Sequence, residues 1–126
     1  MAPTILVVED HPDTGILIAR TLQPQGYSVT LVADGESALA ATADQWPDLA
    51  IVDVLLPRID GLRIVRMLRQ CDPHLPVIVI SAAHHVLEQP NVVFAGLDPH
   101  SIAFLAKPFS LTDLLSLVRQ QLSRPS

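Results

Sequence analysis

The chain has 126 residues, 49% of them hydrophobic and 17% charged, and its formal net charge at pH 7 is −5. We predict a single domain over residues 1–126, with a core at about 4–123 and a short tail, because this length can bury a sizeable core. The acidic balance and the scattered Lys and Arg residues argue against direct nucleic-acid binding. The one cysteine excludes an internal disulfide framework and fits a reducing compartment.

The apolar runs of the chain are too short to span a membrane. Runs such as 5–8 and 77–80 are far below the ~18 residues that a membrane helix needs. The N-terminal Met-Ala-Pro-Thr leads directly into a predicted strand and lacks the charged and apolar regions of a signal peptide. We therefore expect a soluble cytoplasmic protein with no membrane partner.

Strands and helices are predicted to alternate along the chain. In order, we predict a strand at 5–8, a helix at 12–23, a strand at 27–32, a helix at 36–43, a strand at 49–53, a helix at 62–71, strands at 77–80 and 102–106, and a last helix that begins with the capping pattern Ser110-Leu-Thr-Asp113. Such alternation implies an α/β fold, a doubly wound five-stranded parallel sheet with helices on both faces.

Some side chains outside the strands also carry predictions. Three arginines alternate with apolar residues in the helix at 62–71, and we predict that Arg63, Arg66 and Arg69 form a solvated face. Cys71 at the end of that helix is predicted to be a core or half-buried thiol. Trp46 with Pro47 is predicted to be a packing anchor.

Polar residues stand at the predicted carboxyl ends of the strands: Glu9 and Asp10 after the first, Asp53 after the third, Ser81 after the fourth and Lys107 after the fifth. Parallel strands end at one edge of a sheet, where ligands bind, so we expect these side chains to meet. Two carboxylates ~4 Å apart repel by about 4 kcal/mol at an effective dielectric near 20, so cations must neutralise them. Lys107 supplies one charge, and Mg²⁺ suits the remaining oxygen ligands.

Such a set resembles a phosphoryl-transfer centre, with a carboxylate nucleophile, a metal, a lysine and a hydroxyl. Each residue alone has a more ordinary interpretation. A lone Asp53 would be a cap or turn residue, and Ser81 would bond to backbone. Lys107 would be a solvated loop lysine, and Phe104 a core residue.

In this order the residues resemble the receiver domain of two-component response regulators, a flavodoxin-like, CheY-like fold, over about 4–123. Glu9 and Asp10 match the acidic pair that binds Mg²⁺, and Asp53 matches the phosphoacceptor, followed by Pro57 and Asp60-Gly61. The resemblance implies that the backbone carbonyl of Leu55 is a further metal ligand.

The later part of the chain continues the resemblance. Ser81, followed by Ala82, matches the hydroxyl residue that binds the phosphoryl group, and Lys107 matches the conserved lysine before a typically cis proline. Phe104 occupies the place of the aromatic switch residue, whose ring turns inward when the hydroxyl of Ser81 moves.

The resemblance implies that a sensor histidine kinase or a histidine phosphotransfer protein donates a phosphoryl group to Asp53 with Mg²⁺ in place. The domain would be no enzyme beyond its own phosphorylation and autodephosphorylation. Its output would be a downstream protein partner or an output domain absent from this chain, and a phosphorylation-dependent homodimer is a further expectation. Both a stand-alone receiver and a part of a larger regulator remain open.

The segment 84–101 departs from the family pattern. A helix through Pro90 would lose a hydrogen bond and cost ~3 kcal/mol, so we predict a short, shifted or mobile fourth helix. The pair His84-His85 is not expected to bind one metal ion, because adjacent helical residues point about 100° apart. Two alternatives to a phosphoacceptor remain. The first is an aspartyl phosphatase, which would need a second Asp two residues after Asp53; Leu55 occupies that position, and this counts against a phosphatase. The second is a pseudo-receiver, which would bind partners without phosphate.

Overall fold

The computed structural model describes residues 2–54, 61–82 and 101–123. Within them, five parallel strands form one sheet in the order β2-β1-β3-β4-β5. The elements are β1 (Thr4–Val8), α1 (Pro12–Leu22), a 3-10 turn η1 (Gln23–Gln25), β2 (Ser28–Val32), α2 (Gly35–Asp44), β3 (Leu49–Asp53), α3 (Gly61–Cys71), β4 (Val77–Ser81), β5 (Ile102–Ala106) and α6 (Leu111–Leu122). The predicted α/β class and parallel sheet are confirmed, and the predicted element bounds lie within one residue of those observed.

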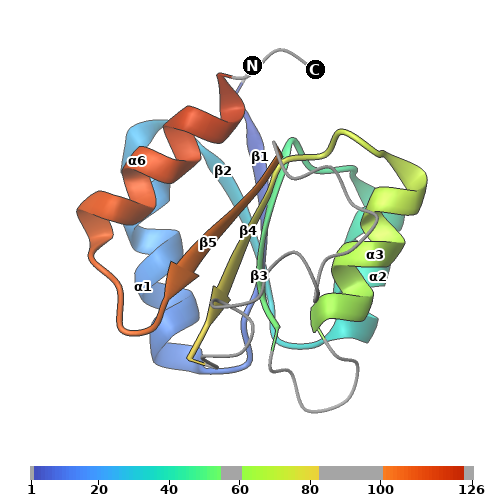
Figure 1. Cartoon of the computed structure of the whole chain (residues 1–126), viewed down its shortest axis with the longest axis horizontal. Coiled ribbons are helices and arrows are strands. Elements are labelled where there is room, and N and C mark those ends of the chain that lie inside the picture. The colour runs from blue at the N-terminus through green and yellow to red at the C-terminus, as the bar shows by residue number, and fades with distance from the viewer. Residues whose placement is uncertain (1, 55–60, 83–100, 124–126) are drawn as a thin grey trace.

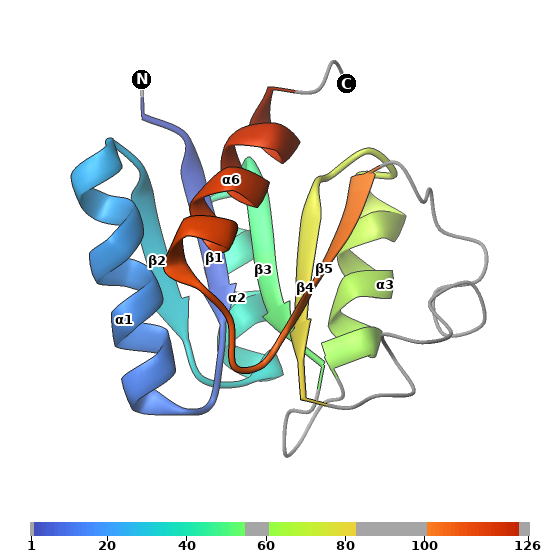
Figure 2. The ribbon, with the colours of Figure 1, turned by 60° about the vertical axis from the view of Figure 1, so that its left-hand side comes forward.

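Helices cover both faces of the sheet (Figure 1). Alternate residues of β1 point to opposite faces: Ile5 and Val7 belong to the cluster that includes residues of α1 and α6, and Leu6 and Val8 to the cluster with residues of α2 and α3. Figure 2 shows the same arrangement from a second direction, with the sheet between the two helical layers. Every residue of β1, β3 and β4 is buried, which explains why their sequences show no alternation of polar and apolar residues.

Helix ends follow signals in the sequence. Asp34 caps α2 through its side chain, which accepts a hydrogen bond from the backbone N–H of Ser37 at 2.7 Å. Ser110 caps α6 in the same way, accepting from the N–H of Asp113 at 3.3 Å, as the capping pattern predicts. Gly26 ends η1 with φ of 96°, a left-handed conformation that favours glycine.

The prediction of a solvated arginine face was wrong for Arg69. Arg63 is exposed and Arg66 half-buried, whereas Arg69 is only 4% exposed. Its guanidinium donates to the carbonyl of Pro73 at 3.0 Å and to Oγ of Ser101 at 2.7 Å. Three residues fall about 60° short of a full helical turn, so residues at this spacing drift around α3 and the last one reaches the buried side.

The prediction for Cys71 was also wrong. Cys71 is exposed, because it is the last residue of α3 and lies beyond the buried stretch of that helix. Of the predicted anchor pair, Pro47 is buried, whereas Trp46 is 39% exposed.

Some predictions concern residues outside the described part of the chain. They are the unusual fourth helix within 84–101, the histidine pair His84-His85, the metal ligand Leu55, and the matches at Pro57 and Asp60. In the described residues, no helix is long and apolar enough to cross a membrane.

Candidate functional site

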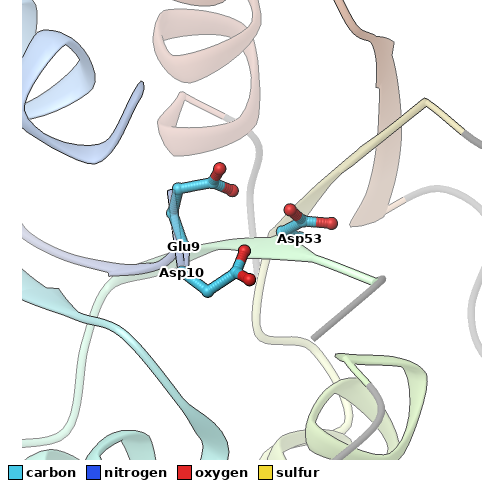
Figure 3. A group of neighbouring side chains, drawn as sticks. All are labelled: Glu9, Asp10 and Asp53. Atoms are coloured by element: carbon cyan, nitrogen blue, oxygen red, sulfur yellow. The ribbon is translucent and has the colours of Figure 1, made fainter. Parts of the chain in front are cut away.

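Three acidic side chains meet at the carboxyl edge of the sheet. Glu9 and Asp10 directly follow β1, and Asp53 ends the neighbouring β3, whose Val52 pairs with Val8. Figure 3 shows the three carboxylates gathered beside the end of β3. One carboxylate oxygen from each residue lies within 4.8 Å of the others. Glu9 and Asp53 are buried and Asp10 is exposed, so the cluster opens to solvent on one side.

Lys107 brings a positive charge to this cluster. Its Nζ lies 2.8 Å from Oε1 of Glu9 and 2.9 Å from Oδ2 of Asp53. Lys107 follows β5, two strands away from β3 in the sheet, so its side chain reaches across the end of β4. Its backbone N–H also donates to the carbonyl of Ser81 at 3.0 Å. The interpretation of Lys107 as a solvated loop lysine is therefore wrong. The peptide bond between Lys107 and Pro108 is cis, as the resemblance implied.

The pKa of Glu9 is set first by its burial and then by the charged groups beside it. Burial raises the pKa of Glu9 to about 7, and the neighbouring Asp53 acts in the same direction, while Lys107 opposes the rise. Burial lowers the pKa of Lys107, but its hydrogen bonds to Glu9 and Asp53 outweigh this, so the pKa is raised overall. Among the described residues, three carboxylates face the single ammonium of Lys107 at this edge of the sheet.

The donor set fits a hard divalent cation. Oε1 of Glu9 binds Lys107, whereas its buried Oε2 has no hydrogen-bond partner among the described residues. A buried polar atom without a partner costs about 1–3 kcal/mol, so a ligand for this oxygen would be stabilising. Three carboxylates beside a solvent-exposed opening match the oxygen ligands that Mg²⁺ prefers. The residues present are therefore consistent with the predicted Mg²⁺ site.

Ser81 and Phe104 lie on the two strands beside the cluster. Ser81 ends β4, is fully buried and pairs with Ala106 of β5. Phe104 is half-buried and packs against the core cluster on the α2 and α3 face. Its position is thus compatible with a core role and with the switch role that the resemblance implies.

The contact between Lys107 and Glu9 was not predicted in this form. The sequence indicated that Lys107 would lie near the carboxylates, but not that its ammonium would bind two of them together. Glu9 and Lys107 are 98 positions apart in the chain, and no local pattern relates them. The only available signal was that both follow strands predicted to be parallel.

Comparison with known proteins agrees with this geometry. Residues 5–119 match the family model described as response regulator receiver domain. The response regulator MprA of Mycobacterium sp. (strain KMS) is 40% identical over 126 residues, which are 100% of this chain and 53% of that protein. MprA of Mycobacterium tuberculosis (strain ATCC 25177 / H37Ra) is 40% identical over 124 residues, or 98% of this chain and 52% of that protein. The chain thus spans about half the length of these curated relatives.

Solved structures share the fold over nearly the whole chain. The receiver domain of NtrX from Brucella abortus superposes with a TM-score of 0.83 at 32% identity, covering 96% of this chain and 99% of that one. The response regulator TrrA from Thermotoga maritima, solved in complex with Mg²⁺ and BeF, gives a TM-score of 0.81 at 27% identity, covering 96% and 99%.

Proposed function

The chain belongs to the response regulator receiver domain family, and on this premise we propose that Asp53 accepts a phosphoryl group. The observation that carries the proposal is the double contact of Lys107, at 2.8 Å to Glu9 and 2.9 Å to Asp53. It places a cation against the proposed nucleophile, inside a cluster of three carboxylates. A purely structural ion pair would need one carboxylate, and this site holds three within 4.8 Å.

The donor is the phosphohistidine of a histidine kinase or a phosphotransfer protein. A carboxylate oxygen of Asp53 attacks phosphorus, the P–N bond breaks, and the imidazole leaves and takes up a proton from solvent. The Lys107 ammonium balances charge on the acceptor and the transferring group. Glu9, Asp10 and Asp53 are the residues that would hold Mg²⁺, which when bound would supply positive charge against the transferring group. No step acts on a further substrate, so the domain is a phosphorylated switch rather than an enzyme for other molecules.

The transferred group then changes contacts on β4 and β5. The hydroxyl of Ser81, buried at the end of β4, donates to a phosphoryl oxygen. Its movement removes contacts beside Phe104, and the ring shifts on β5. The surface over β5 changes with it and binds a downstream protein, an output domain or a second copy of the chain. These partners act in the cytoplasm.

The proposal is tested by intact mass after incubation with acetyl phosphate and Mg²⁺. Wild type is expected to gain ~80 Da, the mass of one phosphoryl group on a single activated nucleophile. Asp53→Asn and wild type with the metal chelated are expected to gain nothing. A gain that survives Asp53→Asn would overturn the assignment of the acceptor.

The absence of any adduct on a folded wild type would favour a pseudo-receiver, which binds partners without phosphate. Beryllofluoride binding separates this outcome from rapid autodephosphorylation, because it mimics the phosphoryl group without hydrolysis. Wild type that binds beryllofluoride with Mg²⁺ but shows no adduct retains the phosphoacceptor assignment with a short-lived product.

A further inference from the structure

Gly61 lies directly against the backbone of the proposed phosphoacceptor. It is the first residue of α3, is buried, and donates its N–H to the carbonyl of Val54 at 3.3 Å. Val54 directly follows Asp53, so the start of α3 is bonded to the end of β3 next to the site.

A side chain at position 61 would collide with this backbone. A Cβ built on Gly61 lies against the carbonyl oxygen of Asp53, 2.5 Å from Cα of Val54 and 2.8 Å from the carbonyl carbon of Asp53. Carbon atoms that are not bonded normally approach to about 3.5–4.0 Å. All three obstructing atoms are main chain, so none can rotate away as a side-chain end could.

Both elements that meet at Gly61 are held by other contacts. Asp53 pairs with Ile80 of β4, and the N–H of Val54 donates to the carbonyl of Ile80 at 3.3 Å. On the other side, α3 is anchored by three buried residues of the core, Ile64, Val65 and Leu68. A Cβ at position 61 can therefore be accommodated only by moving the peptide of Asp53 or the beginning of α3.

We propose that Gly61 is a positioning residue for Asp53, and this inference rests on the proposed function of Asp53 as phosphoacceptor. The missing side chain allows α3 to begin in contact with the Asp53 peptide. This contact holds the carboxylate 2.9 Å from Lys107 and within the acidic cluster. Gly61 has no side chain with which to bind a donor or a metal, and acts through the backbone of Asp53 and Val54.

Gly15 offers a matched comparison within the same chain. A Cβ on Gly15 of α1 would meet only the side chain of Leu31, at 2.9 Å from Cδ1 and 3.3 Å from Cδ2. Leu31 is 38% exposed, so the end of its side chain can turn into solvent. Both glycines are buried helical residues, but only Gly61 contacts main-chain atoms of the site.

The test compares Gly61→Ala with Gly15→Ala in the phosphorylation reaction with acetyl phosphate and Mg²⁺. Gly61→Ala is expected to lower the saturating rate constant by about 100-fold, the effect of a ~1 Å misplacement of a reacting group. Its KM for acetyl phosphate is expected to stay unchanged, because no donor contact is altered. Gly15→Ala is expected to keep both values.

A second readout needs neither metal nor phosphate. Lys107 is the only lysine in the sequence, so lysine-selective isotope labelling gives one side-chain NMR signal. The Lys107 ammonium contacts Asp53, and displacement of Asp53 in Gly61→Ala is expected to shift this signal. The signal of Gly15→Ala is expected to match that of wild type.

The outcomes separate the inference from the proposed function. A normal rate and an unchanged Lys107 signal in Gly61→Ala, with an active wild type, overturn the role of Gly61 alone. A wild type that forms no adduct and does not bind beryllofluoride overturns the proposed function, while the Lys107 signal still reports whether Gly61 sets the position of Asp53. Gly15→Ala also replaces a glycine inside α1 by a better helix former, so it can compensate for a general loss of stability. If Gly61→Ala fails to fold even when combined with Gly15→Ala, the glycine serves folding as a whole and the positioning role is overturned.

Discussion

The carboxyl edge and the amino edge of the sheet each hold a basic side chain among polar partners. At the carboxyl edge, Lys107 binds the carboxylates of Glu9 and Asp53, with Asp10 beside them. At the opposite edge, Arg69 at the end of α3 binds two neutral oxygens, from Pro73 and from Ser101, which directly precedes β5.

The two edges differ in the chemistry of the partners that the described residues supply. Lys107 contacts two carboxylates, and burial raises the pKa of one of them, Glu9, to about 7. The acceptors of Arg69 among the described residues are a carbonyl and a hydroxyl, which do not titrate in the physiological range. The carboxyl edge therefore holds groups that can exchange a proton or bind a cation, whereas the hydrogen bonds of Arg69 to Pro73 and Ser101 join the end of α3 to the start of β5.

The largest expected effect follows from removing the cation at the carboxyl edge. Lys107→Met leaves Glu9 and Asp53 without their ammonium, and the rate of phosphorylation by acetyl phosphate is expected to fall about 100-fold or more. Lys107→Arg keeps the charge with a different shape and is expected to lose less. Lys107→Met with a wild-type rate, measured by the same intact-mass assay, would contradict the role of this edge.

At the amino edge, the expected effect is on stability and not on phosphorylation. Arg69→Met removes the hydrogen bonds to Pro73 and Ser101, and is expected to lower the free energy of unfolding by about 1–3 kcal/mol. Urea denaturation measures this change, with the exposed Arg63→Met as a control expected to stay within about 0.5 kcal/mol of wild type. A loss of phosphorylation per folded molecule in Arg69→Met would show that the two edges are coupled.

A pH dependence of stability, similar in size to the effect of Arg69→Met, is expected from Glu9 without any substitution. The pKa of Glu9 is raised from 4.5 in the unfolded chain to about 7 in the fold, so the folded state binds the proton more tightly. Glu9 therefore stabilises the fold least at high pH, and stability is expected to fall by on the order of 2 kcal/mol as pH rises from ~4.5 through ~7.

Urea denaturation at several pH values, with the metal chelated, measures the slope of the free energy of unfolding against pH. Glu9→Gln, which cannot ionise, is expected to lose it, so the difference between the two proteins isolates Glu9 from other titrating groups. Excess Mg²⁺ is expected to reduce the slope in wild type, because a cation favours the ionised carboxylate. An equal slope in wild type and Glu9→Gln would show that Glu9 does not cause the pH dependence of stability.

The sequence by itself predicted the alternation of strands and helices. It also predicted that each polar residue of the site stands at the end of a strand. Apolar runs, glycine turns and capping residues are local signals, and parallel strands must end at one edge of their sheet. The convergence of Glu9, Asp10, Asp53 and Lys107 followed from these rules, and the structure confirms it. The roles of Ser81 and Phe104 and the ligand at Leu55 stay predictions.

Three features were decided by tertiary structure. Lys107 binds both Glu9 and Asp53, which are 98 and 54 residues away in the chain. This double contact depends on how close the strand ends lie to one another. Arg69 is buried because its position around the helix axis places it on the inner side of α3, where Ser101 accepts its hydrogen bond. Gly61 contacts the Asp53 peptide because α3 begins against β3. Sequence pattern indicates which face or edge a residue occupies, but the approach of two packed elements depends on all the side chains between them.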